Sequence, residues 1–325
     1  MTSRSNLLKA MVKDAYAYYF EKYEEVPTVF DQLFDVEDSN AAYEQYTTAI
    51  GPNKLTKVAE GVAIPRQTAS EGFTVYCANF KYPAELAITN EALDDNQKID
   101  NFLKSWAEGL GEVVRNKQES EHAGIFNEGG FTAGTSAFFD NSIPGILTPG
   151  YGMLAYDTIP FFALTGAPRT AKHGGTYYNS IAALTLDGTG LQTLMKLMSV
   201  TNAYNEAGIE ITIQPNVLLC QYNSDNYYTA KRLLESTGDV AGLHSGVENI
   251  WKASLRLIGW RFLTDSDAWY IGVAKQGLKS LARMAPVIDY YEDKSIDSQV
   301  VRMRARWGRC VTNFRYWAAA NISTS

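Results

Sequence analysis

The stretch IDNFLKSWAEGLGEVVRNK, residues 99–117, has the clearest periodicity in this sequence. Its apolar side chains recur every three or four positions without a proline, which predicts an amphipathic helix. Acidic residues within 91–95 favour a helix start, because the positive end of the helix dipole stabilises negative charge. Gly129 and Gly130 predict its end. A helix from about residue 96 to 127 would be about 48 Å long, which predicts a spine that other elements lie along.

Upstream of this helix, the pattern changes to that of a hairpin. Residues 55–64 form the outgoing arm, a turn-rich tip follows at 65–72, and the return arm at 73–89 alternates between apolar and polar positions. Neither arm has enough apolar residues for a core of its own, so the hairpin needs support from elsewhere. Residues 35–57 are polar and loosely patterned, and residues 6–23 have helical spacing.

Downstream of the helix, short helices and strands follow one another without regular alternation, which predicts an α+β fold. The expected elements, after a loop-rich stretch at 129–175, are helices at 191–204 and 227–235 and strands at 255–262 and 269–273. Residues 209–221 predict a strand or a broken pair of strands around Pro215.

The segment 301–307 predicts a strand with two unlike faces. Apolar side chains and arginines alternate along it, so one face is buried and the other is cationic. The arginines pair with acidic neighbours of the same chain, or they contact nucleic-acid phosphate. The apolar positions are Val301, Met303, Ala305 and Trp307, and the cationic ones are Arg302, Arg304 and Arg306.

Composition excludes several classes of protein. The chain has 325 residues, of which 46% are hydrophobic, and its formal charge is −7 without a basic domain, which disfavours a sequence-specific nucleic-acid reader. No apolar run approaches the roughly 18 residues of a membrane span. Charged residues Lys9, Lys13 and Asp14 interrupt the first helical segment, so we predict no signal peptide and a product that stays in the cytoplasm.

No catalytic, cofactor-binding or metal-binding residues are predicted. The histidines His122, His173 and His244 stand in no ligand or triad spacing. We expect His122 at the polar edge of the long helix and the other two in loops. Cys77, Cys220 and Cys310 form no CxxC pair, so we expect three reduced thiols.

Two short segments invite a chemical reading but have simpler explanations. Gly188-Thr-Gly190 matches no phosphate-binding motif, so we expect only the start of a helix. Asp265-Ser-Asp267 lacks the continuation of a calcium loop, which favours a turn between strands.

The order of these elements resembles that of the major capsid proteins of tailed bacteriophages, which have the Hong Kong 97-like fold. Short phrases support the resemblance at matching places along nearly the whole chain. They are EGFTVYCANFKYPAELAITNEALDDN (71–96), AGIFNEGGF (123–131), AKHGGTYYN (171–179), IQPNVLLCQYNSDNYYTAKRLLES (213–236), LRLIGWRFLTDSDAWYIGVAK (255–275) and VRMRARWGRCVTNFRYW (301–317).

This resemblance implies an α+β capsid fold divided into four parts. They are an N-terminal arm at 1–42, an extended E-loop hairpin at 43–90, a P-domain with the long spine helix at 91–204 and 288–325, and an A-domain at 205–287. Because the arm is short, the resemblance implies a separate scaffolding protein or none.

The resemblance also implies a function without catalysis. Such subunits self-assemble into pentamers and hexamers of an icosahedral phage head that encloses double-stranded DNA, with the E-loop and N-arm laid over neighbouring subunits. It implies portal, scaffolding or decoration proteins as further partners, non-specific contact with packaged DNA, no membrane, assembly in the host cytoplasm and a place in the virion. Two alternatives remain: an encapsulin-type bacterial compartment shell with the same fold, and an enzyme with an unrecognised site.

Overall fold

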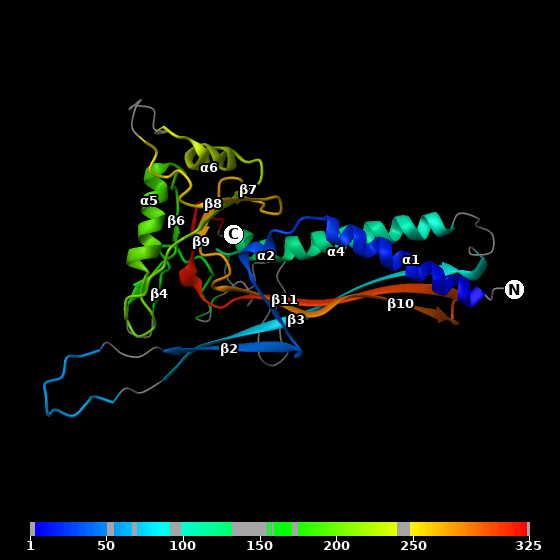
Figure 1. Ribbon diagram of the computed structural model, residues 1–325, viewed down its shortest axis with the longest axis horizontal. Helices are drawn as coiled ribbons and strands as arrows, with labels where there is room; N and C mark the ends of the chain where they lie inside the picture. The colour runs from blue at the N-terminus through cyan, green and yellow to red at the C-terminus, as the bar shows by residue number, and fades with distance from the viewer. Residues whose placement is uncertain are drawn as a thin grey trace.

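The long helix α4 (Ile99–Asn127) packs across one face of a five-stranded sheet. The protein is described by a computed structural model over residues 4–50, 55–66, 70–91, 99–131, 155, 157, 159–170, 175–238 and 248–323 (Figure 1). This long sheet has the order β1-β10-β11-β3-β2. Its strands are β1 (Asp35–Asp38), β10 (Leu278–Asp293), β11 (Ser298–Val311), β3 (Ser70–Thr89) and β2 (Tyr43–Ile50).

A first core lies between the helices and the long sheet. Leu103, Ala107, Leu110 and Val114 of α4 pack on apolar side chains of β10 and β11, together with Tyr19 of α1 (Arg4–Glu25). The two helices approach closely at Gly111, where an added Cβ would lie 2.6 Å from the backbone oxygen of Tyr19. Both helices match their predicted ranges at 6–23 and 96–127.

Strand β11 has the two faces that its sequence predicts. Val301, Met303, Ala305 and Trp307 are buried, whereas Arg302, Arg304 and Arg306 are partly exposed on the other face. Trp307 stacks on the Tyr82 ring of β3 with the centroids 3.8 Å apart. Alternation of apolar and cationic side chains therefore correctly placed this strand in the sheet.

The second sheet, here called the compact sheet, has shorter strands in the order β6-β12-β9-β7-β8. Helix α5 (Gly188–Lys196) and helix α6 (Asp225–Glu235) cover one of its faces. A π-helical turn, Leu197–Thr201, continues α5 within the predicted helix at 191–204. The strands are β6 (Ser180–Ile181), β12 (Trp317–Ala320), β9 (Trp269–Gly272), β7 (Val217–Gln221) and β8 (Arg256–Trp260).

The other face of the compact sheet covers the largest core, and the end of α4 lies at its centre. Phe126 is fully buried, and its ring lies within 6.4 Å, between centroids, of each of six other rings. Short elements close this core: α2 (Phe30–Leu33), the 3₁₀ turn Phe314–Tyr316, and the paired strands β4 (Arg169–Thr170) and β5 (Thr176–Tyr177).

The structure corrects the outgoing arm of the hairpin. Strand β2 (Tyr43–Ile50) pairs with the first part of β3, and residues 55–66 contain no strand. The predicted arm at 55–64 is therefore wrong. Because none of the described side chains of β2 is fully buried, selection for alternating apolar residues is weak and the sequence looks polar there.

Two further expectations need correction. The strand predicted at 209–221 is formed only at its end, by β7, while residues 209–216 lie in irregular backbone. The apolar stripe of α4 is wider than its buried face, since Phe102 is 51% and Val113 62% exposed.

The predicted four-part division of the chain stays a prediction. Within it, β12 of the segment 288–325 pairs with β9 of the segment 205–287.

We predict that Phe126→Ala lowers the free energy of unfolding by about 3–5 kcal/mol, because it opens a cavity among six rings. Chemical denaturation of the unassembled subunit measures this loss. Phe102→Ala, which removes a half-exposed ring from the same helix, is the matched control and should cost about 1 kcal/mol or less. Equal losses would contradict the central position of Phe126.

Candidate assembly surfaces

The described residues do not cluster into a reaction centre. Among them, no group of three or more histidine, cysteine, aspartate or glutamate side chains could hold a metal ion. The described helices also contain no segment long and apolar enough to span a membrane. His173 and His244 lie outside the described residues, so their predicted loop positions stay predictions.

His122 lies in the core and not at the polar edge of α4, so this expectation is wrong. Its Nδ1 donates to the Gln118 carbonyl at 2.7 Å, which leaves Nε2 to accept from the Ser280 hydroxyl at 2.8 Å. Phe30 of α2 stacks on the imidazole with the ring centroids 4.4 Å apart. Burial lowers the pKa of His122 to about 3. The flanking QESE sequence (118–121) is polar, as on a solvent-facing helix surface. In the structure, α2 and β10, which are distant in the chain, cover this part of the helix.

The two short segments with possible chemistry have the simple roles expected of them. The Asp187 carboxylate caps α5 by accepting from the Gly190 N–H at 2.6 Å, so the helix start is already capped by the chain itself. Asp265 accepts from the Asp267 N–H at 3.0 Å within the turn between β8 and β9. The three cysteines are free and buried, and burial raises the pKa of Cys220 to about 12.

Acidic neighbours within the chain engage two of the arginines on the open face of β11. Asp289 forms ion pairs with both Arg302 and Arg304, and Glu85 lies 4.0 Å from Arg302. These contacts support the expectation of pairing within the chain over the expectation of contact with phosphate.

The first candidate surface is the hairpin formed by β2, residues 55–66 and β3, here called the projecting hairpin. Its tip extends away from the body of the molecule (Figure 1). Leu55 is 87% and Ile64 85% exposed, and Val62 is exposed as well. Exposed apolar side chains close together on a projecting segment make it a candidate surface for binding a partner. The sequence predicts a strand at these residues and gives no sign of an apolar tip, although the lack of alternation around Gly61 could have indicated it.

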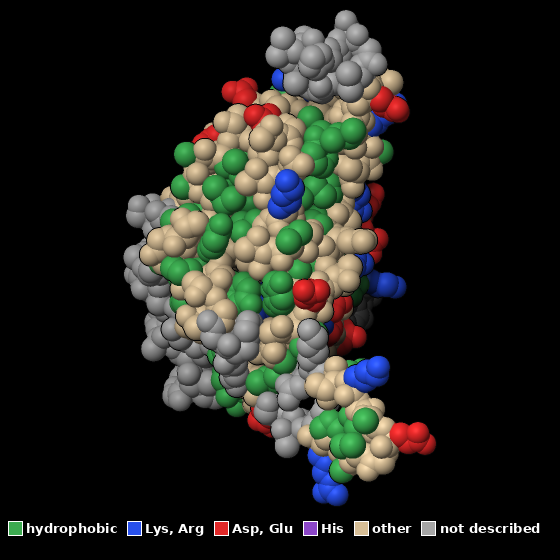
Figure 2. Space-filling view, turned by 90° about the vertical axis from the view of Figure 1, so that its left-hand side faces the viewer, with side chains coloured by type: hydrophobic (Ala, Val, Ile, Leu, Met, Phe, Trp, Pro, Cys, Tyr) green, Lys and Arg blue, Asp and Glu red, His purple; other side chains and the backbone are tan. Residues whose placement is uncertain are grey.

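A second surface lies on the face that α5 occupies. Figure 2 shows apolar side chains gathered there with few charges among them. Val200, on the turn that ends this helix, is 66% exposed, and Leu184 and Met195 are partly buried beside the core. An apolar surface with so few charges fits contact with another protein.

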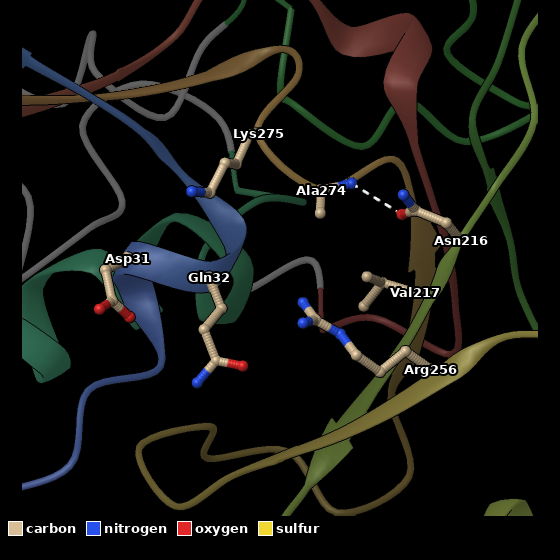
Figure 3. Close-up of a pocket in the computed structure, with 7 residues that line it drawn as sticks. All are labelled: Asp31, Gln32, Asn216, Val217, Arg256, Ala274 and Lys275. Carbon is tan, nitrogen blue, oxygen red and sulfur yellow. Dashed lines mark hydrogen bonds between the residues drawn. The ribbon is translucent and has the colours of Figure 1, made fainter.

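A third feature is a cavity of about 570 Å³ between α2 and the compact sheet (Figure 3). Five of its seven lining residues are polar or charged, and they come from segments far apart in the chain, so no local motif could have predicted it. The lining residues are Asp31, Gln32, Asn216, Val217, Arg256, Ala274 and Lys275.

Comparison with known proteins settles the fold. No family model and no curated protein matches the chain. Among solved structures, the capsid of a native GTA particle is similar over 92% of both chains, with a TM-score of 0.53 at 11% identity. The capsid of an empty GTA particle covers 92% of this chain and 91% of its own, with a TM-score of 0.52 at 12% identity.

This chain has the Hong Kong 97-like capsid fold. The fold expected from the sequence is therefore confirmed, including its α+β class, its long spine helix and its extended hairpin. At this level of identity, the similarity concerns the path of the backbone and not the residues on the surfaces.

We predict that subunit stability falls as the pH is lowered below about 6.5. Folded His122 stays neutral down to a pKa of about 3, whereas unfolded His122 binds a proton near pH 6.5. Protonation therefore favours the unfolded chain, at about 1.4 kcal/mol for each pH unit. Denaturant unfolding between pH 7 and pH 4 measures this slope. His122→Asn should reduce the slope by this amount, and an unchanged slope would contradict the buried neutral imidazole.

Proposed function

We propose that this protein is a structural capsid subunit that self-assembles into the pentamers and hexamers of an icosahedral phage head enclosing double-stranded DNA. The observation that carries the proposal is the fold shared with the capsid of a GTA particle over 92% of both chains. A likeness over 92% of the chain leaves little of it for a separate activity. We propose that the protein acts by assembly and not by catalysis.

The exposed apolar surfaces of the subunit favour this proposal. The projecting hairpin has exposed apolar side chains that its own subunit does not cover, so burial against a neighbouring copy would stabilise both the hairpin and the shell. The apolar face at α5 would pack against the next compact sheet around a capsomer. Such head-to-tail contacts form closed assemblies only where the angle between subunits permits it.

The further partners are proposed on chemical grounds. The chain has a formal charge of −7, and its own carboxylates engage Arg302 and Arg304, which favours weak, non-specific contact with packaged DNA. Portal, scaffolding or decoration proteins would complete such a head. We propose the virion as the place of the protein and the host cytoplasm as the place of its assembly.

No observation on the described residues favours the encapsulin-type compartment. The contents of purified particles would distinguish a phage head from such a compartment.

The proposal predicts that the purified protein forms capsomers or closed particles. Electron microscopy of the expressed product should show regular shells, because the hairpin and the apolar faces find partners only in an assembly. Light scattering that shows only monomer at all concentrations and salt levels, with and without a scaffolding protein, would contradict it.

Assembly should also order the projecting hairpin. We predict that amides of residues 55–66 exchange rapidly in the unassembled subunit and slowly in shells, whereas α4 around Ala107 is protected in both. Hydrogen exchange measured by mass spectrometry tests this. Slow exchange of the tip in the monomer would show that it packs on its own subunit.

Replacing both Leu55 and Ile64 with serine should leave the subunit folded but prevent stable shells, because the two side chains are 87% and 85% exposed in the monomer. Unfolding curves and electron microscopy measure the two effects. Lys57→Ser is the control in the same loop, since it removes no apolar anchor. Shells of normal stability from the double variant would contradict the role of the tip.

A further inference from the structure

The cavity between α2 and the compact sheet is lined by exposed hydrogen-bond donors that no side chain of the described residues engages. Arg256 extends from β8 across the cavity toward α2, and Lys275 lies at its upper rim (Figure 3). Within the part of the chain that the structure describes, no ion pair or side-chain hydrogen bond engages either cation. Asn216 accepts from the Ala274 N–H at 2.9 Å, so its amide nitrogen remains as a third donor.

The opposite wall carries one carboxylate, that of Asp31, against the two cations. Asp31 already accepts from the Thr28 hydroxyl at 2.7 Å, and no ion pair joins it to Arg256 or Lys275. The Gln32 amide nitrogen donates to the Thr28 carbonyl at 2.9 Å. Two cations and a free amide donor around a cavity of about 570 Å³ are suited to a carboxylate.

The backbone at Lys275 fixes where this side chain leaves the turn between β9 and β10. Its φ of +60° lies in the left-handed region, which residues with a side chain rarely adopt. The conformation is held by the Lys275 N–H, which donates to the Leu33 carbonyl of α2 at 2.8 Å. This contact sets the position of Lys275 beside α2.

The tip of the projecting hairpin presents a carboxylate in an ordered turn. The Val62 N–H donates to the Ala59 carbonyl at 3.2 Å, and Gly61 has a φ of +81°, as the third position of a type II turn requires. Glu60 is therefore held at the second position, exposed to solvent, close in the chain to the exposed apolar residues of the tip. The tip, which includes Glu60, extends away from α2 and β8 of its own subunit (Figure 1).

We infer that the Glu60 carboxylate of one subunit binds between Arg256 and Lys275 of a neighbouring copy of this chain. This inference rests on the proposed function, and it names the position at which the projecting hairpin is received. The apolar tip supplies contact area, whereas the charge pair fixes where along the neighbour the tip docks.

Charge reversal tests the inference in the full-length chain. Glu60→Arg and Arg256→Glu should each raise the subunit concentration needed for shell formation about fivefold or more. The double variant, in which the two charges are exchanged, should return to near the wild-type value. Lys231→Glu and Glu235→Lys, which reverse exposed charges on α6, are the matched controls and should assemble like the wild type. Circular dichroism confirms that each subunit is folded.

The outcomes separate the inference from the proposed function. Wild-type protein that forms no shell overturns both. Shells from the wild type and unchanged assembly of both single variants overturn only the inference. If Arg256→Glu impairs assembly but the exchanged double variant does not recover, the cavity receives another acidic segment or a free anion, and the assignment of Glu60 is wrong. As a direct readout, Glu60→Cys combined with Lys275→Cys should give disulfide-linked oligomers when shells are oxidised with diamide.

Discussion

Both sheets depend on one helix. The first half of α4 buries its apolar face on the long sheet, and its last turn inserts Phe126 into the core beneath the compact sheet. Because one rigid element contributes to both cores, the two sheets are linked through α4, and the strands of either could not shift without losing contact with it. The same helix carries Glu119, whose buried carboxylate accepts from the Val29 N–H at 2.8 Å and from the Trp260 indole at 2.6 Å.

Glu119 shows how the cores are joined by polar groups as well as apolar ones. Its partners come from the chain just before α2 and from β8, so one carboxylate connects three parts of the fold. Burial raises its pKa, although these hydrogen bonds oppose the shift. In addition, two ion pairs are almost fully buried: Arg309 with Glu121 and Arg315 with Glu206. Removing one partner of such a pair lowers the free energy of unfolding by more than the intact pair contributes to it, because it leaves an unpaired buried charge. These charges therefore favour one specific arrangement of the fold.

The consequence for function lies in what these cores leave uncovered. The subunit satisfies its internal charges and buries its central aromatic side chains, yet it leaves an apolar hairpin tip, an apolar face at α5 and a cavity with two unpaired cations. Among the described residues, no element of the same subunit covers these surfaces. Further copies of the same chain would offer both apolar area and a carboxylate, which is the reason for proposing assembly.

The sequence by itself determined the elements whose burial is periodic. The long helix, α6 and the two faces of β11 follow from spacing alone, because one side of each packs on a core and the other does not. Strand β9 is an apolar run that is buried on both faces, between the two cores of the compact sheet. The resemblance of ordered phrases then predicted the capsid fold. Only the tertiary structure decided the rest. Strand β2 carries no pattern because neither of its faces is fully buried, and His122 looks exposed until α2 and β10 cover it. The cation pair of Arg256 and Lys275 is assembled from different segments, and positions that meet only in space leave no local signal in the chain.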